Sequence, residues 1–79
     1  MNQIYERQFG CNIRRAREKR GMTQEALAAQ LQIMGCDITR GALAKMETGL
    51  RHVYPDEIRC LRKCLRVSYE ELFEGEAHG

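Results

Sequence analysis

The residues best able to do chemistry lie between positions 22 and 49, in a run of helix-forming residues with two basic side chains. This segment reads as two short amphipathic helices separated by a loop, and the second helix has a small, basic outer face. Arg40 and Lys45 lie on that face together with Gly41 and Ala44. Such a face fits the major groove of duplex DNA, where arginine and lysine donate hydrogen bonds to O6 and N7 of guanine.

The length and composition of the chain indicate one small helical domain. Its 79 residues leave no room for a second domain. Five aromatic residues, no Trp and a single Pro favour a core of aliphatic side chains, and no run of alternating β-branched residues indicates strands. No stretch approaches the roughly 18 apolar residues that span a membrane, and the first ten residues lack the features of a secretory signal. We therefore expect an all-α, cytoplasmic protein with no membrane contact.

The net charge of +2 is small, but the charges are unevenly distributed. Residues 1–52 carry nine Lys and Arg against five Asp and Glu, whereas residues 53–79 carry four against six. The first part suits phosphate, and the second suits solvent or a partner. Ordinary surface variation would produce the same asymmetry, so charge alone leaves both interpretations open.

Four cysteines raise the question of a metal or redox site. Cys60 and Cys64 are four residues apart on an expected helix, where both would face the core as small apolar side chains. Zinc ligands generally come in pairs separated by two residues, and the chain has no such pair. We expect buried or incidental thiols, no metal and no cofactor. The alternative is a metal or redox site, with Cys36 in a loop as the candidate thiol sensor.

Apolar spacing and helix-end signals predict the first helix. Phe9, Ile13 and Ala16 recur at helical spacing, which predicts a helix over about residues 9–20. Residues 1–8 are expected to be an N-terminal extension of this helix.

The next two helices each begin after a threonine. Thr23 is a good N-cap for a second helix that runs to about residue 32, and Thr39 is a good N-cap for a third. The segment 33–38 between them contains a glycine and breaks the helical pattern, so we expect a loop there. Gly49 ends the third helix.

The last third of the chain predicts two more helices. Pro55 suits the first position of a fourth helix, and Ser68 with Glu71 forms a capping box for a fifth. The helical domain is therefore expected to cover residues 9–74, followed by a flexible C-terminal tail at residues 75–79.

These motifs, in this order, resemble the helix-turn-helix domain of phage repressors and Cro proteins, also called the XRE family. Each motif is weak alone, but the set is specific. The motifs read Ile13-x-x-Ala16-Arg17, Gly21-Met22-Thr23-Gln24-x-x-Leu27-Ala28, Ile38-Thr39, Leu43-x-Lys45-Met46-Glu47-x-Gly49, Leu65-x-Val67-Ser68 and Glu71-Leu72-Phe73. The resemblance implies a compact, five-helix, lambda-repressor-like fold. The chain departs from the family between Leu31 and Glu47, where the connection between the second and third helices is longer than usual. The resemblance therefore does not imply the angle between these two helices or the role of the 32–38 loop.

By this resemblance, the third helix, about residues 39–48, is the recognition helix. Its base-reading positions would be Thr39, Arg40, Gly41, Ala44 and Lys45. For Arg40 and Lys45 the alternative is solvated surface, or phosphate contact without base reading. The phosphate-binding residues would be Thr23, Gln24, Arg14, Arg20, Arg51 and His52.

Two other groups of residues would have structural tasks. Arg17 and Glu47 are expected to form a partly buried ion pair that ties the first helix to the end of the third. A homodimer interface is expected on the C-terminal helix, from Tyr69, Leu72 and Phe73. Tyr5 could add to it, and for Leu72 the alternative is that it completes the monomer core.

The resemblance implies a small bacterial or phage transcriptional regulator, of the repressor type, that is associated with the nucleoid. It would bind a near-palindromic operator in double-stranded DNA as a homodimer. The alternative is an antitoxin-like module that neutralises a partner protein and regulates its own promoter. No carboxylate pair, Ser/His or Cys/His arrangement or Gly-rich phosphate loop indicates an enzyme.

Overall fold

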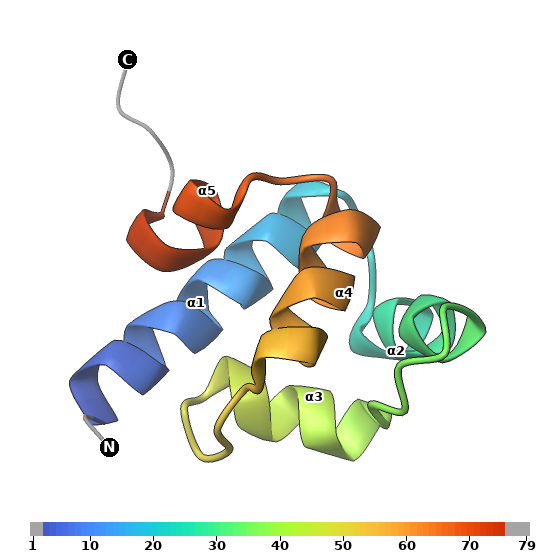
Figure 1. The fold of residues 1–79 in the computed structure, drawn as a ribbon, viewed down its shortest axis with the longest axis horizontal. Helices are drawn as coiled ribbons and strands as arrows, with labels where there is room; N and C mark the ends of the chain where they lie inside the picture. Colours follow the sequence, from blue (N-terminus) through green and yellow to red (C-terminus); the bar gives the residue numbers. More distant parts are fainter. Residues whose placement is uncertain (1–2, 76–79) are drawn as a thin grey trace.

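The computed structural model describes residues 3–75, which form five α-helices and no strand (Figure 1). The helices are α1 (Gln3–Lys19), α2 (Gln24–Ile33), α3 (Arg40–Glu47), α4 (Pro55–Leu65) and α5 (Tyr69–Glu74). The predicted all-α class and the five helices are therefore confirmed. In Figure 1, α3 lies at the bottom of the view and α5 at the top, with α1 and α4 between them.

The helices α2, α3 and α5 each begin after a residue that the sequence predicted as an N-cap. Thr23 accepts a hydrogen bond from the Ala26 amide at 3.0 Å, and Thr39 accepts one from the Ala42 amide at 3.1 Å. These bonds satisfy amides that have no partner within the helix. Before α5, Ser68 and the residue three positions later exchange bonds in the predicted capping box. The two helices of the candidate DNA-binding motif thus begin in the same way.

The long connection between α2 and α3 is an ordered turn whose side chains complete the core. The predicted loop included Ile33, but this residue belongs to the last turn of α2. The amide of Cys36 donates to the Leu31 carbonyl at 2.8 Å, and Gly35, at φ 87°, is the left-handed residue that this helix end requires. Cys36 and Ile38 are buried. The lengthened connection is therefore held against the core by the side chains of Cys36 and Ile38.

The cysteines are free thiols in this fold. Burial, together with a hydrogen bond to Cys60, raises the pKa of Cys36 to about 12. Burial also raises the pKa of Cys64. Since the thiolate is the reactive form, Cys36 is poorly suited to the thiol-sensor role considered as an alternative.

The core lies where α1 crosses the other helices. Its completely buried members are Ile13, Leu27, Leu31, Ile38, Leu43, Met46, Leu61, Leu65 and Leu72. The first helix packs against α3, α4 and α5, and α2 packs against α3 and α4. Because α3 has only eight residues, it depends on this packing and would not form alone.

Two glycines allow the backbone of α1 to approach the end of α3 closely. A Cβ at Gly10 would collide with the carbonyl of Met46 and would lie 2.8 Å from the backbone of Glu47. A Cβ at Gly49 would lie 2.7 Å from the Cα of Arg7. Gly10 is therefore buried inside a helix that begins as early as Gln3, and it marks the crossing point of α1 and α3.

The structure corrects the predicted role of Leu72 at the C-terminal end. The Leu72 side chain is completely buried, and the Leu72 backbone carbonyl accepts a hydrogen bond from Asn12 at 2.8 Å. Leu72 therefore completes the monomer core and offers no exposed surface for a dimer. Gly75, predicted to begin the flexible tail, follows α5 directly and donates to the Glu71 carbonyl at 2.9 Å. The rest of the predicted tail, residues 76–79, lies outside the described residues.

Candidate nucleic-acid interface

The face of α3 that points away from the core carries the predicted base-reading residues. Arg40, Gly41 and Lys45 are exposed and Ala44 is half-buried. Thr39, the N-cap of the helix, is exposed as well. Leu43, Met46 and Glu47 on the opposite side are buried. The helix thus presents two basic and two small residues along one uncovered stripe.

The first turn of α2 contacts both ends of α3. Glu25 lies 3.6 Å from Arg40 at the start of α3, measured from the carboxylate oxygen to Nε. Gln24 donates a hydrogen bond of 3.1 Å to Glu47 at the end of α3. The hydrogen bond from Gln24 ties the start of α2 to the end of α3. The pair with Glu25 is exposed, so it contributes little to stability but places a negative charge beside a predicted base-reading arginine.

A buried ion pair joins α1 to the end of α3. Arg17 donates to the two carboxylate oxygens of Glu47 at 2.7 Å and 3.0 Å, and it donates to the Met22 carbonyl at 2.8 Å. The two side chains are only 10% and 3% exposed. The hydrogen bond to Glu47 raises the pKa of Arg17, which stays charged. With Gln24, the Glu47 carboxylate connects three helices.

The two predicted phosphate ligands after α3 contact carboxylates of the chain. Arg51 makes a two-pronged pair with Glu57, with both N–O distances at 2.9 Å. His52 lies 2.8 Å from Glu6 of α1, measured from Nδ1 to Oε1. Both residues thus pin the α3–α4 loop, a role that the sequence analysis did not predict.

Both arginines predicted to bind phosphate near the end of the first helix, Arg14 within α1 and Arg20 directly after it, are exposed and contact other groups of the chain. Arg14 is exposed and pairs with Glu18 one turn away at 3.3 Å. Arg20 donates from Nε to the Leu65 carbonyl at 2.8 Å, at the end of α4 that Figure 1 places far from α3. The structure therefore does not bring Arg20 together with the other predicted site residues.

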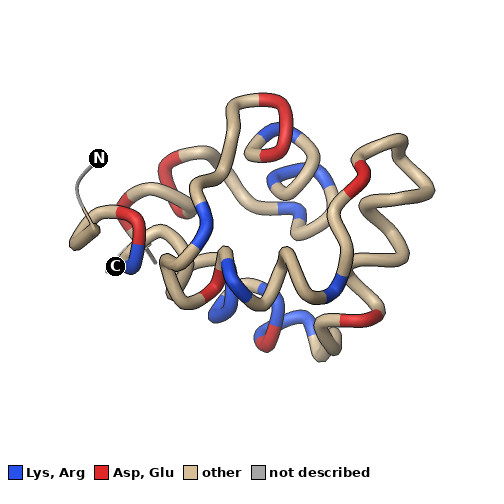
Figure 2. Tube along the Cα trace, turned by 90° about the horizontal axis from the view of Figure 1, so that it is seen from below, with Lys and Arg blue, Asp and Glu red and all other residues tan. Residues whose placement is uncertain are grey.

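Two exposed residues beside the outer face of α3, Arg7 and Thr48, were not among the predicted site residues. Arg7 is exposed on α1, and its backbone lies against Gly49 directly after α3. Thr48, the C-cap of α3, is exposed, and its hydroxyl donates to the Lys45 carbonyl at 3.2 Å. Helical spacing from Ala44 could have identified Thr48, but the position of Arg7 depends on how α1 crosses α3. Seen from the α3 side, basic and acidic positions are interspersed along the backbone (Figure 2).

Residues 8–74 match the family described as Helix-turn-helix domain. The chain belongs to this helix-turn-helix family. It is also 30% identical over 69 residues to the HTH-type transcriptional activator BcrR of Enterococcus faecalis. The match covers 87% of this chain but only 31% of that protein, so the chain spans about a third of its relative's length. No solved structure matches significantly.

Within residues 3–75, no helix combines the length and apolar character that crossing a membrane requires. In the same residues, His, Cys, Asp and Glu side chains form no group of three that could hold a metal ion.

Replacing Glu47 tests the buried connection between the helix-turn-helix helices and α1. Glu47→Ala leaves Arg17 charged, buried and unpaired, and we expect a loss of about 3–5 kcal/mol in the free energy of unfolding, measured with urea. Glu18→Ala removes only the exposed partner of Arg14 and is expected to cost at most about 1 kcal/mol. The double variant Arg17→Met/Glu47→Leu removes both charges and should recover much of the loss. Equal costs for Glu47→Ala and Glu18→Ala would contradict the structural role.

The ion pair in the α3–α4 loop predicts a dependence of stability on pH. The hydrogen bond from Arg51 lowers the pKa of Glu57 from its ordinary value of 4.5. A carboxyl with a lowered folded-state pKa contributes stability above pH 4.5, and this contribution is lost as the pH falls through the folded-state value. We expect the urea-unfolding free energy of Glu57→Gln to fall less steeply below pH 4.5 than that of wild type. The exposed control Glu70→Gln should follow the wild type; identical slopes for the two variants would contradict this assignment.

Proposed function

We propose that this chain is a sequence-specific DNA-binding domain that regulates transcription without catalysis, with α3 in the major groove of duplex DNA. The observation that carries the proposal is the uncovered stripe of α3, where Arg40 and Lys45 lie on either side of Gly41 and Ala44 in the sequence. Small residues allow close approach to the bases, and the two basic side chains are suited to guanine O6 and N7. The named activity of the BcrR relative and the resemblance to phage repressors both support transcription regulation.

The rigid mounting of α3 supports base reading over loose phosphate binding. Base contacts require a helix held at a defined depth and angle, whereas phosphate contacts tolerate variation. Gln24 and Arg17 hold the end of α3 through Glu47, and Glu25 faces its start. A helix held at its end by buried hydrogen bonds, and packed on the core through Leu43 and Met46, can direct Arg40 and Lys45 at particular base pairs.

Phosphate contacts are proposed for the rim of this surface. The start of α2, with Thr23 and Gln24, presents helix amides that suit an anion. Arg7 of α1 lies with its backbone against Gly49, and the exposed Arg14 lies two turns further along α1. Each neutralised phosphate would lower log K by about 0.9 per tenfold rise in salt. We leave Arg20, Arg51 and His52 out of this set because each already bonds to another part of the chain.

We further propose that two copies bind a near-palindromic operator, because one eight-residue helix reads too few base pairs for useful specificity. The proposed interface includes Tyr5 and Phe73, which are 70% and 52% exposed. Phe73 rests on Phe9 with ring centroids 4.9 Å apart, so one side of it is supported and the other is available. Tyr69, 45% exposed, is the third proposed member.

Selection from a random duplex pool tests the proposed function. The wild type should enrich a motif with two related half-sites, and Arg40→Ala/Lys45→Ala should lose it because both base-reading charges are gone. The matched control is Arg59→Ala/Lys63→Ala, which removes the same charge from exposed positions of α4 and should keep the motif.

Three outcomes of this selection count against the proposal. If the control variant also loses the motif, the loss in Arg40→Ala/Lys45→Ala would be due to the lower net charge of the protein and not to the position of these residues on α3. Enrichment of a motif by both double variants would place base reading elsewhere. A wild type that enriches nothing would exclude specific DNA binding and favour the antitoxin-like alternative.

The acidic neighbour of Arg40 gives a second test. Glu25→Gln removes a carboxylate 3.6 Å from the guanidinium and reduces repulsion of phosphate, so we expect several-fold tighter DNA binding by fluorescence anisotropy at low salt. The gain should shrink at high salt, because exposed charges are screened. Glu70→Gln, on α5, should leave affinity unchanged. Weaker binding by Glu25→Gln would show that the carboxylate is needed to orient Arg40.

A further inference from the structure

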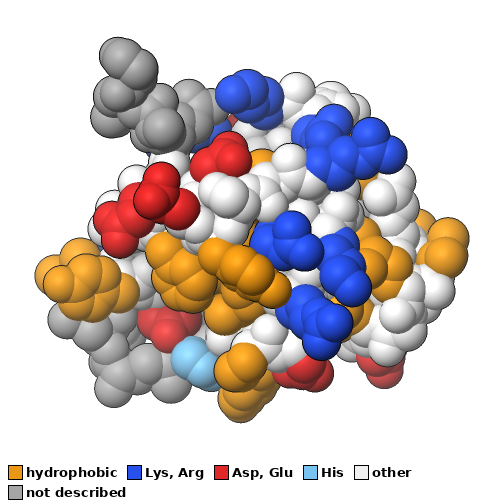
Figure 3. Space-filling view, turned by 45° about the horizontal axis from the view of Figure 1, so that its top comes forward, with side chains coloured by type: hydrophobic (Ala, Val, Ile, Leu, Met, Phe, Trp, Pro, Cys, Tyr) orange, Lys and Arg blue, Asp and Glu red, His pale blue; other side chains and the backbone are white. Residues whose placement is uncertain are grey.

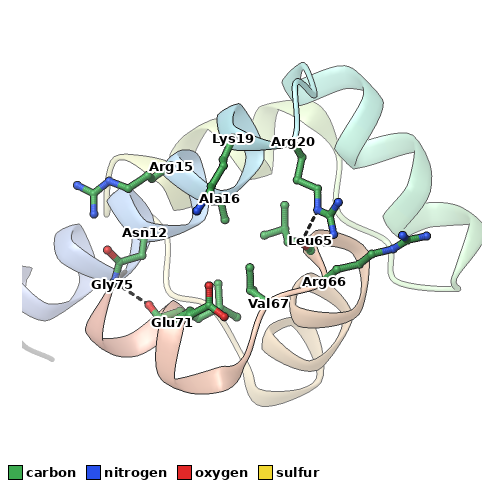
Figure 4. Close-up of a pocket in the computed structure, with 11 residues that line it drawn as sticks. Asn12, Arg15, Ala16, Lys19, Arg20, Leu65, Arg66, Val67, Glu71 and Gly75 are labelled. Atoms are coloured by element: carbon green, nitrogen blue, oxygen red, sulfur yellow. Dashed lines mark hydrogen bonds between the residues drawn. The ribbon is translucent and has the colours of Figure 1, made fainter. Parts of the chain in front are cut away.

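A hollow of about 290 Å³ lies between the C-terminal half of α1, the end of α4 and α5 (Figure 4). Ala16 and Val67, which are partly buried, give it an apolar floor above the completely buried Leu65. None of its lining residues comes from α2 or α3, so it is separate from the proposed DNA-reading surface. Its volume is close to about 300 Å³, the lower end of the range for small-molecule sites, which are concave and largely apolar with a few polar groups.

Four cationic side chains line this hollow against one carboxylate. Arg15 and Lys19 lie one turn apart on α1, Arg20 directly follows α1, and Arg66 caps the end of α4. In Figure 4, the side chains of Arg15 and Arg66 start at opposite ends of the hollow and point outward, away from it. The carboxylate, Glu71, already accepts hydrogen bonds from the amide and hydroxyl of Ser68 in the capping box of α5. In the space-filling view, basic side chains gather on this face beside apolar ones (Figure 3).

Arg66 occupies a backbone position that arginine rarely adopts. Its φ of 56° and ψ of 47° are left-handed, and it is the one non-glycine residue in the described part of the chain with a positive φ. The ends of α1, α2 and α3 place Gly21, Gly35 and Gly49 at the equivalent position. A left-handed conformation is unfavourable for any residue with a Cβ. The chain thus carries a cation at the edge of the hollow where glycine would be the more stable residue.

Internal hydrogen bonds hold the walls of the hollow in place. Arg20 bonds to the Leu65 carbonyl and so ties α1 to the end of α4. Asn12 is buried and donates to the Leu72 carbonyl, which ties α1 to α5. The hollow is therefore a preformed feature of three joined helices, and a ligand would not have to order its walls.

We propose that this hollow binds a small organic anion with a short apolar body, such as an alkyl carboxylate or an alkyl phosphate ester. The apolar body would lie on the floor formed by Ala16 and Val67. The anionic group would lie at the rim beside Lys19, and the exposed Arg66 side chain would turn inward to add positive charge. Both carboxylate and phosphate satisfy this arrangement. The site is independent of whether α3 reads DNA.

Titration of this 79-residue chain with octanoate, followed by amide chemical shifts in NMR, tests this proposal. We expect saturable shifts centred on Ala16, Val67 and Gly75. Octanol, which has the apolar body without the charge, and inorganic phosphate, which has the charge without the body, should bind much more weakly. Octyl phosphate in place of octanoate shows which anionic group the site prefers; tight binding by either supports the proposal.

Three variants separate binding in the hollow from attraction by net charge. Ala16→Leu fills the floor and should abolish octanoate binding. Arg66→Gly should raise the melting temperature by a few degrees, because it relieves the left-handed arginine, yet weaken octanoate binding several-fold, as expected for one partly exposed charge contact. Lys63→Gln removes a cation from an exposed position of α4 that does not line the hollow, and binding should be unchanged.

The proposal is overturned if octanoate shifts do not saturate, if they spread evenly over the basic surface, or if Ala16→Leu binds like the wild type. It is also overturned if duplex DNA of random sequence shifts the same amides and displaces octanoate, since the basic rim would then be a phosphate-backbone contact. Failure of these tests leaves the proposed function of α3 untouched, because the DNA selection measures a different surface.

Discussion

One buried carboxylate connects the three helices on which the candidate DNA-binding surface depends. Glu47 sits at the end of α3 and accepts hydrogen bonds from Arg17 of α1 and Gln24 of α2. Removing a carboxylate and a guanidinium from water is costly, and only good geometry with further hydrogen bonds offsets that cost. This pair meets the condition, because Arg17 also bonds to the Met22 carbonyl in the connection between α1 and α2. The interaction therefore determines where α3 lies more than it adds to total stability.

The contacts around Glu47 also compensate for the low intrinsic stability of α3, which is a very short helix. Eight residues make few internal hydrogen bonds, and a helix of this length is unstable on its own. Its N-cap at Thr39, its glycine-marked end and its buried residues Leu43 and Met46 together compensate for the short length. Gly10 brings the backbone of α1 close to the end of α3, so the buried ion pair spans a short and rigid gap. The position of the exposed side chains of α3 is therefore set by the contacts that its buried side makes.

The parts of this fold that follow local rules were predictable from the sequence, and the parts that depend on contacts across the chain were not. Thr23, Thr39 and the Ser68 capping box act through bonds to residues three positions away, so the sequence predicted them directly. The pairs Arg51–Glu57 and His52–Glu6 depend on the path of the α3–α4 loop and the early start of α1. Spacing carries no signal for such pairs.

The same distinction explains which predicted site residues changed their expected role. Residues on α3 kept their predicted exposure because helical periodicity specifies a face once the buried side is known. The cations assigned to phosphate by resemblance alone were less secure, because a long side chain can reach several partners: Arg20 bonds to Leu65 and Arg51 to Glu57. Leu72 shows the converse error, since an apolar residue on a terminal helix suits a core as well as a dimer surface, and contact with α1 decides for the core.

The first helix connects the two surfaces of functional interest, and this limits how one could influence the other. Its α3-facing side carries Gly10 and Arg17, while Ala16 faces the hollow near α5. Close packing and a buried ion pair leave α3 little freedom to move relative to α1, so a shift transmitted through the helix is a poor mechanism. A domain of this size is only marginally stable, however, and anything that binds the folded state alone raises its population. A ligand that joins α1, α4 and α5 would therefore act on DNA binding by increasing the amount of folded protein, with no change in which bases α3 reads.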